Sequence, residues 1–154
     1  MATRIREAAV TIRPAMADDL DDIAAIERAV FRDPWSRRSF VDLVGDRRVI
    51  FLVAVDENAV VGYAVVLMSG IECELANLAI ARLLQRRGLG AQLLEEAIAR
   101  ARAKGCTEMF LEVRESNAAA IHLYSSAGFQ AVGRRARYYA RPIEDAIVMK
   151  AGLK

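Results

Sequence analysis

Apolar residues recur along this chain with two different periods, one typical of helices and one typical of strands. Over residues 88–103 the apolar positions lie three or four residues apart, which predicts an amphipathic helix that ends at Gly105. The same period over residues 20–30 predicts an earlier helix, with Asp18 or Asp19 as its N-cap.

Capping residues predict two shorter helices. Ser36 can cap a helix that runs to Leu43. Asn117 can cap a helix that ends before Gly128, which is placed to terminate it. These two segments complete the helices that we expect.

Short runs rich in β-branched residues predict strands. We expect strands over residues 10–13, 49–55, 60–68, 75–80, 109–113, 130–134 and 146–150. Asp56-Glu57-Asn58 lies between two of these runs and is typical of a hairpin turn.

The order of elements predicts the fold class. A helix between two strands favours parallel pairing of those strands, whereas hairpins are antiparallel. We therefore expect an α/β (α+β) fold with a mixed, mostly antiparallel sheet and helices on both faces. In such sheets ligands bind where neighbouring strands part at their carboxyl ends. No linker divides the chain, so we expect residues 1–154 to form a single domain.

Composition excludes several classes of protein. Of the 154 residues, 55% are hydrophobic, which excludes disorder, and no apolar run approaches the length of a membrane span. The net charge of +2 is too small to indicate nucleic-acid binding. Cys73, Cys106 and His122 lack the spacing of a metal site. Residues 1–6 have no signal-peptide pattern, so we expect a cytoplasmic protein with free thiols and no metal.

Gln85-Arg86-Arg87-Gly88-Leu89-Gly90 lies between a predicted strand and a predicted helix. Glycines allow the backbone to curl closely, and unpaired N–H groups at a helix start suit a pyrophosphate. Leu93 stands where a dinucleotide fingerprint needs its third glycine, and the Gly-Lys-Ser/Thr of a P-loop is absent. The alternative is an ordinary turn with solvated arginines.

Glu112 is the most informative single residue, because a carboxylate within an apolar strand is costly to bury. Such a group can act as a base, and the alternative is an ion pair with an arginine such as Arg114. Tyr124 lies on the same helix face as Asn117, seven positions away. Its hydroxyl can protonate a leaving group, or the ring can simply belong to the core.

Together these segments resemble the GNAT family of N-acetyltransferases. The resemblance rests on Asn77-Leu78-Ala79-Ile80, the glycine motif, residues 111–117 and Leu123-Tyr124, followed by Gly128-Phe129. Within that family the chain is most similar to the RimI-type ribosomal-protein alanine N-acetyltransferases. Pro34-Trp35-Ser36, Tyr138-Tyr139 and residues 144–147 carry this closer likeness, which covers nearly the whole chain.

The resemblance implies a GNAT fold with a splayed central parallel strand pair, and acetyl-CoA as co-substrate. It implies that Glu112 is the general base and Tyr124 the general acid. It also implies a set of cofactor-binding residues. These are Leu78, Ala79 and Ile80 for the pantetheine arm, Arg86, Arg87, Gly88, Leu89, Gly90 and Ala91 for the pyrophosphate, and Asn117.

The implied acceptor is the N-terminal alanine of a small-subunit ribosomal protein. We expect no direct contact with nucleic acid or membrane, and a monomer or weak dimer. Two departures fall near the expected peptide groove: Arg32-Asp33 separates Phe31 from Pro34, and the loop between Tyr139 and Glu144 is short.

Two alternatives remain open at this point. The chain can be a GNAT enzyme that acts on another protein N-terminus, a lysine or a small amine. It can also be a non-catalytic module that binds acetyl-CoA, although binding alone requires neither Glu112 nor Tyr124.

Overall fold

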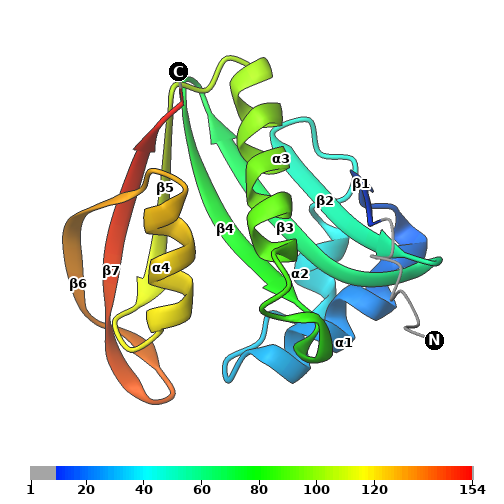
Figure 1. Ribbon diagram of the computed structural model, residues 1–154, viewed down its shortest axis with the longest axis horizontal. Helices are drawn as coiled ribbons and strands as arrows, with labels where there is room; N and C mark the ends of the chain where they lie inside the picture. The colour runs from blue at the N-terminus through cyan, green and yellow to red at the C-terminus, as the bar shows by residue number, and fades with distance from the viewer. Residues whose placement is uncertain (1–9, 154) are drawn as a thin grey trace, which may run out of the picture.

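The structure, a computed structural model, describes residues 10–153 and contains one twisted seven-stranded sheet (Figure 1). The strands lie in the order β1-β2-β3-β4-β5-β7-β6, and only the β4–β5 pair is parallel. The strands are β1 (Thr11–Pro14), β2 (Val49–Asp56), β3 (Ala59–Ser69), β4 (Glu72–Ile80), β5 (Glu108–Arg114), β6 (Gln130–Ala140) and β7 (Ile143–Gly152). The expected mixed, mostly antiparallel sheet is confirmed.

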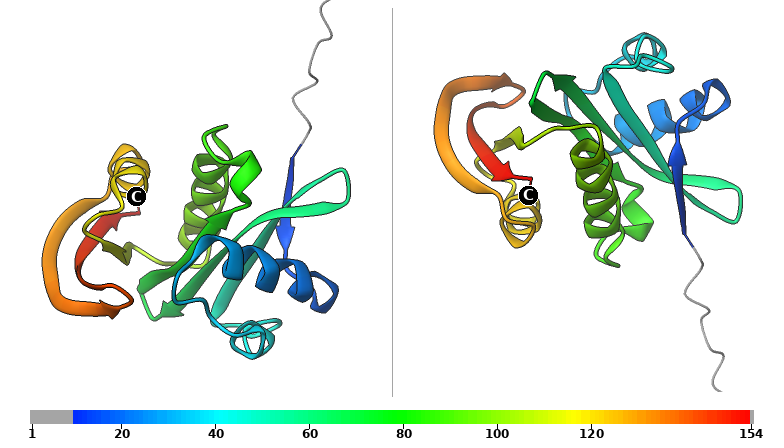
Figure 2. Two further views of the ribbon diagram at one scale, coloured as in Figure 1. Left: turned by 90° about the horizontal axis from the view of Figure 1, so that it is seen from below. Right: turned by 90° about the horizontal axis from the view of Figure 1, so that it is seen from above.

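Helices cover both faces of the sheet (Figure 2). Four α-helices and two short 3₁₀ helices are found among residues 10–153: α1 (Leu20–Val30), α2 (Arg37–Val41), α3 (Leu89–Ala103), α4 (Ala118–Ser126), η1 (Ala17–Asp19) and η2 (Arg82–Leu84). None of these helices is long and apolar enough to cross a membrane. Residues 1–6, where we expect no signal peptide, lie outside the described range.

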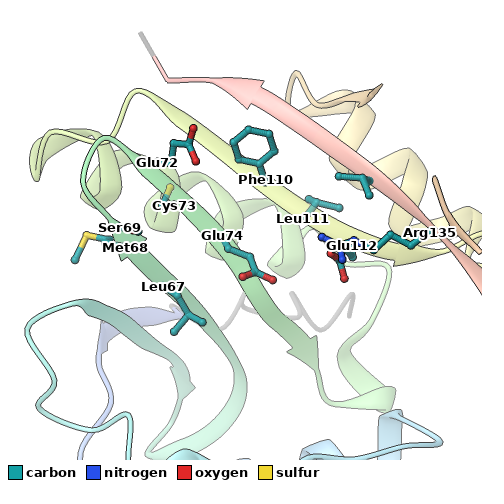
Figure 3. A pocket seen from close by; sticks show the side chains of 11 residues that line it. Leu67, Met68, Ser69, Glu72, Cys73, Glu74, Phe110, Leu111, Glu112 and Arg135 are labelled. Atoms are coloured by element: carbon teal, nitrogen blue, oxygen red, sulfur yellow. Dashed lines mark ion pairs between the residues drawn. The ribbon is translucent and has the colours of Figure 1, made fainter. Parts of the chain in front are cut away.

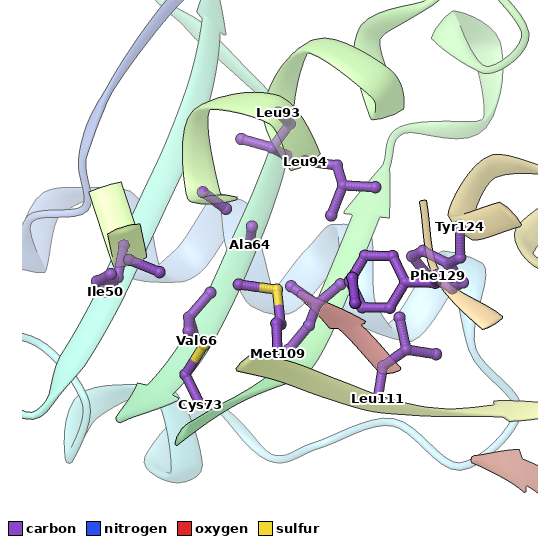
Figure 4. Close-up of a cluster of buried hydrophobic side chains, with 14 of the residues drawn as sticks. Ile50, Ala64, Val66, Cys73, Leu93, Leu94, Met109, Leu111, Tyr124 and Phe129 are labelled. Carbon is purple, nitrogen blue, oxygen red and sulfur yellow. The ribbon is translucent and has the colours of Figure 1, made fainter. Parts of the chain in front are cut away.

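The hydrophobic core has two layers, one on each side of the sheet. On one side α1 and α2 bury Ile23 and Phe40 against β2 and β3. On the other side α3 and α4 cover the strands, with Leu93, Leu94 and Tyr124 in the packing (Figure 4). α3 and α4 therefore share one face, and α1 and α2 share the other.

Two predicted helix N-caps and the predicted hairpin turn are present in the structure. Asn117 Oδ1 accepts a hydrogen bond from the amide of Ala120 at 3.1 Å, and Ser36 Oγ accepts one from Ser39 at 3.3 Å, so both are N-caps. Glu57 and Asn58 have φ values of 47° and 71°, the backbone of a tight hairpin turn.

Two predictions at the ends of elements are wrong. Neither Asp18 nor Asp19 caps α1 through its side chain, because Asp19 binds the Arg13 guanidinium at 2.8 Å and the Met16 amide at 2.7 Å. The last two strands are also longer than predicted. β6 is an edge strand whose side chains are exposed apart from the half-buried Tyr139, so the apolar alternation that marks a strand is missing.

A buried carboxylate joins three elements beneath the α1–α2 connection. Glu27 is only 2% exposed, and its oxygens accept hydrogen bonds from the hydroxyl of Tyr63 on β3 and from Asn77 Nδ2 on β4 at 2.8 Å. They also accept one from the amide of Trp35 at 3.1 Å. Burial and the neighbouring carboxylate raise the pKa of Tyr63, so this hydroxyl stays a donor.

We predict that Glu27→Ala lowers the free energy of unfolding by about 3 kcal/mol, because it leaves three donors without their acceptor. Urea denaturation followed by the fluorescence of Trp35 measures this loss. Asp22→Ala on the same helix is the control, since Asp22 is exposed, and it should cost less than about 1 kcal/mol. Equal stability of the two variants would contradict a structural role for the Glu27 network.

Candidate active site

The candidate site lies where β4 and β5 part. These strands pair only through Glu72, Cys73 and Glu74 of β4, opposite residues 108–110 of β5. One extra residue, Ala76, then interrupts the register of β4 with β3. Such a bulge bends and twists its strand, so β4 turns away while β5 continues alongside β7 (Figure 1).

The parting leaves one edge of β4 open. The amide of Ala81 donates to Val61 O on β3 at 2.8 Å, and successive backbone groups of a strand point to alternate edges. The N–H and C=O groups of Leu78 and Ile80 therefore point into the opening, whereas those of Ala79 point to β3. Gln85 Nε2 donates to Ile80 O at 3.0 Å from across this edge.

The glycine motif forms a tight turn before α3. Arg86 has φ of 66° and Gly88 has φ of 80°, both in the left-handed region. The first bond within α3 runs from the amide of Gln92 to Gly88 O at 3.1 Å. The amides of Leu89, Gly90 and Ala91 therefore have no partner inside the helix, and they form a cluster of donors suited to an anion.

Gly90, in the first turn of α3, faces α4 and β4. A Cβ atom at this position would be 3.5 Å from Leu123 and 3.9 Å from Ile80. Arg86, Arg87, Gly88 and Ala91 are exposed beside it, so the structure brings the predicted anion-binding residues together at the open edge of β4.

Glu112 lies on the face of β5 opposite α3 and α4. Its neighbours Leu111 and Val113 belong to the α3–α4 layer of the core, and side chains alternate along a strand. The Glu112 side chain is 16% exposed, so most of this carboxylate is buried. It borders a cavity of about 370 Å³ whose lining includes Leu67, Glu74 and Phe110 (Figure 3).

Glu112 forms an ion pair with Arg135, and not with Arg114, the partner that we considered from the sequence. Arg135 Nε on β6 lies 2.8 Å from Glu112 Oε1, whereas Arg114 pairs with Glu144 and Asp33. The reason is geometric, since the Arg135 side chain reaches from the edge strand β6 across β7 to Glu112, whereas the Arg114 side chain reaches the β6–β7 turn. The Arg135 side chain is 61% exposed and has room to move.

A second carboxylate faces the same cavity. Glu74 is the last β4 residue paired with β5, and burial together with the negative charge of Glu112 raises the pKa of its carboxyl. Arg135 acts in the opposite direction. The cavity is therefore acidic and suits a cationic group.

Tyr124 lies on the other side of the opening, on α4. Its ring packs against Phe129 with the two centroids 5.9 Å apart (Figure 4). Burial, with a smaller effect of Tyr139, raises the pKa of Tyr124 to about 12. The phenol therefore keeps its proton at neutral pH.

Sequence reasoning missed Glu27 and Arg135. A signal for Glu27 exists, because with Leu20, Ile23 and Ala24 it completes the spacing of the apolar face of α1. A carboxylate on such a face indicates a buried polar network. No comparable signal marks Arg135, which reaches Glu112 from an edge strand across β7.

Comparisons with known proteins identify the family and the fold of the chain. The model of the Acetyltransferase (GNAT) family matches residues 20–129. The ribosomal protein bS18-alanine N-acetyltransferase of Salmonella typhimurium is 38% identical over 141 residues, which cover 90% of this chain and 95% of that protein. The Escherichia coli K12 enzyme of the same name is 36% identical over the same coverage.

Solved structures show the same fold. The crystal structure of the ribosomal-protein alanine N-acetyltransferase from Escherichia coli superimposes with a TM-score of 0.87 at 34% identity, covering 94% of each chain. A NatC complex bound to Gag peptide and CoA gives a TM-score of 0.85 at 23% identity, with 94% of this chain and 99% of that chain covered, and shows the fold alone. The chain therefore belongs to the GNAT family of acetyltransferases and is an N-acetyltransferase.

Proposed function

We propose that this enzyme moves an acetyl group from acetyl-CoA to the α-amine of an N-terminal alanine, on a small-subunit ribosomal protein in the cytoplasm. The observation that carries the proposal is the position of Glu112. Its side chain lines an acidic cavity just beyond the last residue pair between β4 and β5. The relatives from Salmonella and Escherichia coli support the choice of acceptor, since both are named for ribosomal protein bS18 and its alanine.

The open edge of β4 and the start of α3 fit acetyl-CoA. Leu78 and Ile80, on either side of Ala79, direct their backbone groups to the open edge, where Ile80 O accepts a hydrogen bond from the Gln85 side chain, so a pantetheine arm can add along β4 like another strand. The pyrophosphate can bind to the backbone amides of residues 86–91, from Arg86 to Ala91. Asn117 Oδ1 caps α4, so the side-chain nitrogen of Asn117 is the group that can donate a hydrogen bond to the cofactor.

Glu112 and Tyr124 have the two proton-transfer roles. An α-ammonium group has a pKa of about 8, so at neutral pH most of it must lose a proton before it can attack a thioester. Glu112 accepts that proton, directly or through a water, as Arg135 moves aside. The amine nitrogen then attacks the acetyl carbonyl, and as the C–S bond breaks the nitrogen loses its extra proton to water while Tyr124 protonates the departing thiolate. No covalent enzyme intermediate is needed.

Mass spectrometry of acceptors tests the proposal. A peptide with a free N-terminal alanine should gain one acetyl group, whereas the same peptide with a blocked N-terminus, a lysine peptide and spermidine should not. Acetylation of lysine or spermidine instead would keep the family chemistry and overturn the acceptor. Acetyl-CoA binding without product from any acceptor would favour a binding module.

We predict that Glu112→Gln lowers turnover by about 10²–10⁴-fold, the effect of losing a general base, while acetyl-CoA affinity stays near normal. Steady-state kinetics and calorimetry measure the two quantities. Glu108→Gln is the matched control, because Glu108 is on the same strand and also forms an ion pair, with Lys150. A normal rate for Glu112→Gln at saturating acceptor would exclude Glu112 as the base.

We predict that Tyr124→Phe slows turnover by about tenfold or more, because the variant lacks the proton of the phenol. Its melting temperature should stay close to that of the wild type, since the ring keeps its contact with Phe129. A large drop in melting temperature with an unchanged rate would show that the hydroxyl is structural.

A further inference from the structure

The guanidinium of Arg135 already occupies the carboxylate of Glu112. Arg135 Nε lies 2.8 Å from Glu112 Oε1, and both side chains line the same cavity (Figure 3). Among residues 10–153, this is the one ion pair that Glu112 forms. A single side chain therefore neutralises the candidate base before any acceptor arrives.

The register of the strands explains how Arg135 reaches Glu112. Val148 on β7 pairs with Glu112 on one side and with Gly133 on the other. Arg135 stands two residues beyond Gly133, so its side chain leaves the sheet on the same face as Glu112. Because Gly133 has no side chain, the path from Arg135 diagonally across β7 to the carboxylate is open.

The position of Arg135 allows its guanidinium to be displaced. The side chain is 61% exposed, whereas that of Glu112 is only 16% exposed. It extends from the edge strand β6, where the pairing with β7 is irregular between Arg135 and Tyr139. The ring of Tyr138, whose centroid lies 5.8 Å from Arg135 Cζ, offers the guanidinium a second contact. Movement of this side chain therefore disturbs no buried packing.

The charge of the incoming group decides whether it can take the place of the guanidinium. A mostly buried carboxylate that loses its partner is strongly disfavoured, because its charge is then left uncompensated. A cation that arrives as Arg135 leaves avoids this cost, since Glu112 keeps a counter-charge throughout. Glu74, a second carboxyl group that lines the cavity, also favours a cation.

We propose that Arg135 occupies the subsite of the acceptor ammonium group and so determines which acceptors reach Glu112, and this rests on the function proposed above. The charged α-amine replaces the guanidinium on Glu112 and then gives its proton to the carboxylate. Acetylation leaves a neutral amide. Once Glu112 has lost its proton to water, Arg135 returns to it and the product cannot compete. Arg135 is thus a specificity-determining residue that acts through Glu112.

Kinetics of Arg135→Gln test this exchange with the free N-terminal alanine peptide. The acceptor no longer competes with the guanidinium, so its KM should fall about two- to fivefold, the size expected for a solvent-accessible ion pair. We expect kcat and the KM for acetyl-CoA to change less than about twofold. Arg135→Lys should stay closer to the wild type, because it keeps a cation at this position. An unchanged or higher acceptor KM in Arg135→Gln would overturn the proposal.

Arg134→Gln is the matched control, because it removes the same charge from the preceding residue of β6. The Arg134 guanidinium pairs with Glu115 at 2.9 Å and with Asp145 at 3.0 Å. The acceptor KM of this variant should remain near that of the wild type. An equal fall in both variants would show general electrostatic attraction of the acceptor, and would contradict exchange at Glu112.

Methylguanidinium tests whether the vacated place is a cation subsite. It should inhibit Arg135→Gln competitively with the acceptor peptide, because it can restore the missing ion pair with Glu112. The wild type and Arg134→Gln should be less sensitive when sodium chloride keeps the ionic strength equal. Equal inhibition of all three proteins would overturn the proposal.

NMR of the Arg135 Nε–H group gives a readout that does not depend on turnover. With CoA bound, a saturating peptide with a free N-terminus should shift this signal, and Glu112→Gln should shift it as well. The same peptide with an acetylated N-terminus should not. A signal that ignores the free peptide or the Glu112→Gln substitution would overturn the exchange. A wild-type enzyme that acetylates no free amine would instead refute the proposed function.

Discussion

The parting of β4 from β5 is the constraint on which the rest of the site depends. The parallel ladder lasts for only three residue pairs, because the bulge at Ala76 turns β4 away just after Glu74. Unpaired backbone groups inside a sheet are costly unless water or a ligand satisfies them. The protein thus has a strand edge in its interior that a peptide-like cofactor arm can complete.

The two faces of the sheet carry different parts of the candidate site. On one face α3 and α4 lie on either side of the opening, and they carry the amides proposed to bind the pyrophosphate and Tyr124 (Figure 1). On the other face Glu112 borders an acidic cavity that residues of β3, β4 and β5 line together with Arg135 of β6. The proposed proton acceptor, Glu112, and the proposed proton donor, Tyr124, are thereby placed on opposite sides of the gap where the strands part.

Sequence reasoning predicts features that depend on neighbouring residues and fails where distant ones meet. The hairpin at Glu57-Asn58 and the cap at Asn117 follow from local chemistry, and both are confirmed. Side-chain partners across the sheet do not follow from neighbouring residues. The Glu112 ion pair, for example, depends on how β6 twists relative to β7. The Ala76 bulge has no local signature, so the sequence alone does not show where β4 and β5 part.

Hydrogen exchange of the β4 amides, resolved by NMR with and without CoA, tests the central claim that the parted edge receives the cofactor. We expect CoA to protect the amides at Leu78 and Ile80, together with those from Arg86 to Ala91, and to leave the amide of Ala131 on the edge strand β6 unchanged. Protection at the start of α3 without any on β4 would contradict pairing along the strand. CoA binding that protects neither segment would contradict the whole account.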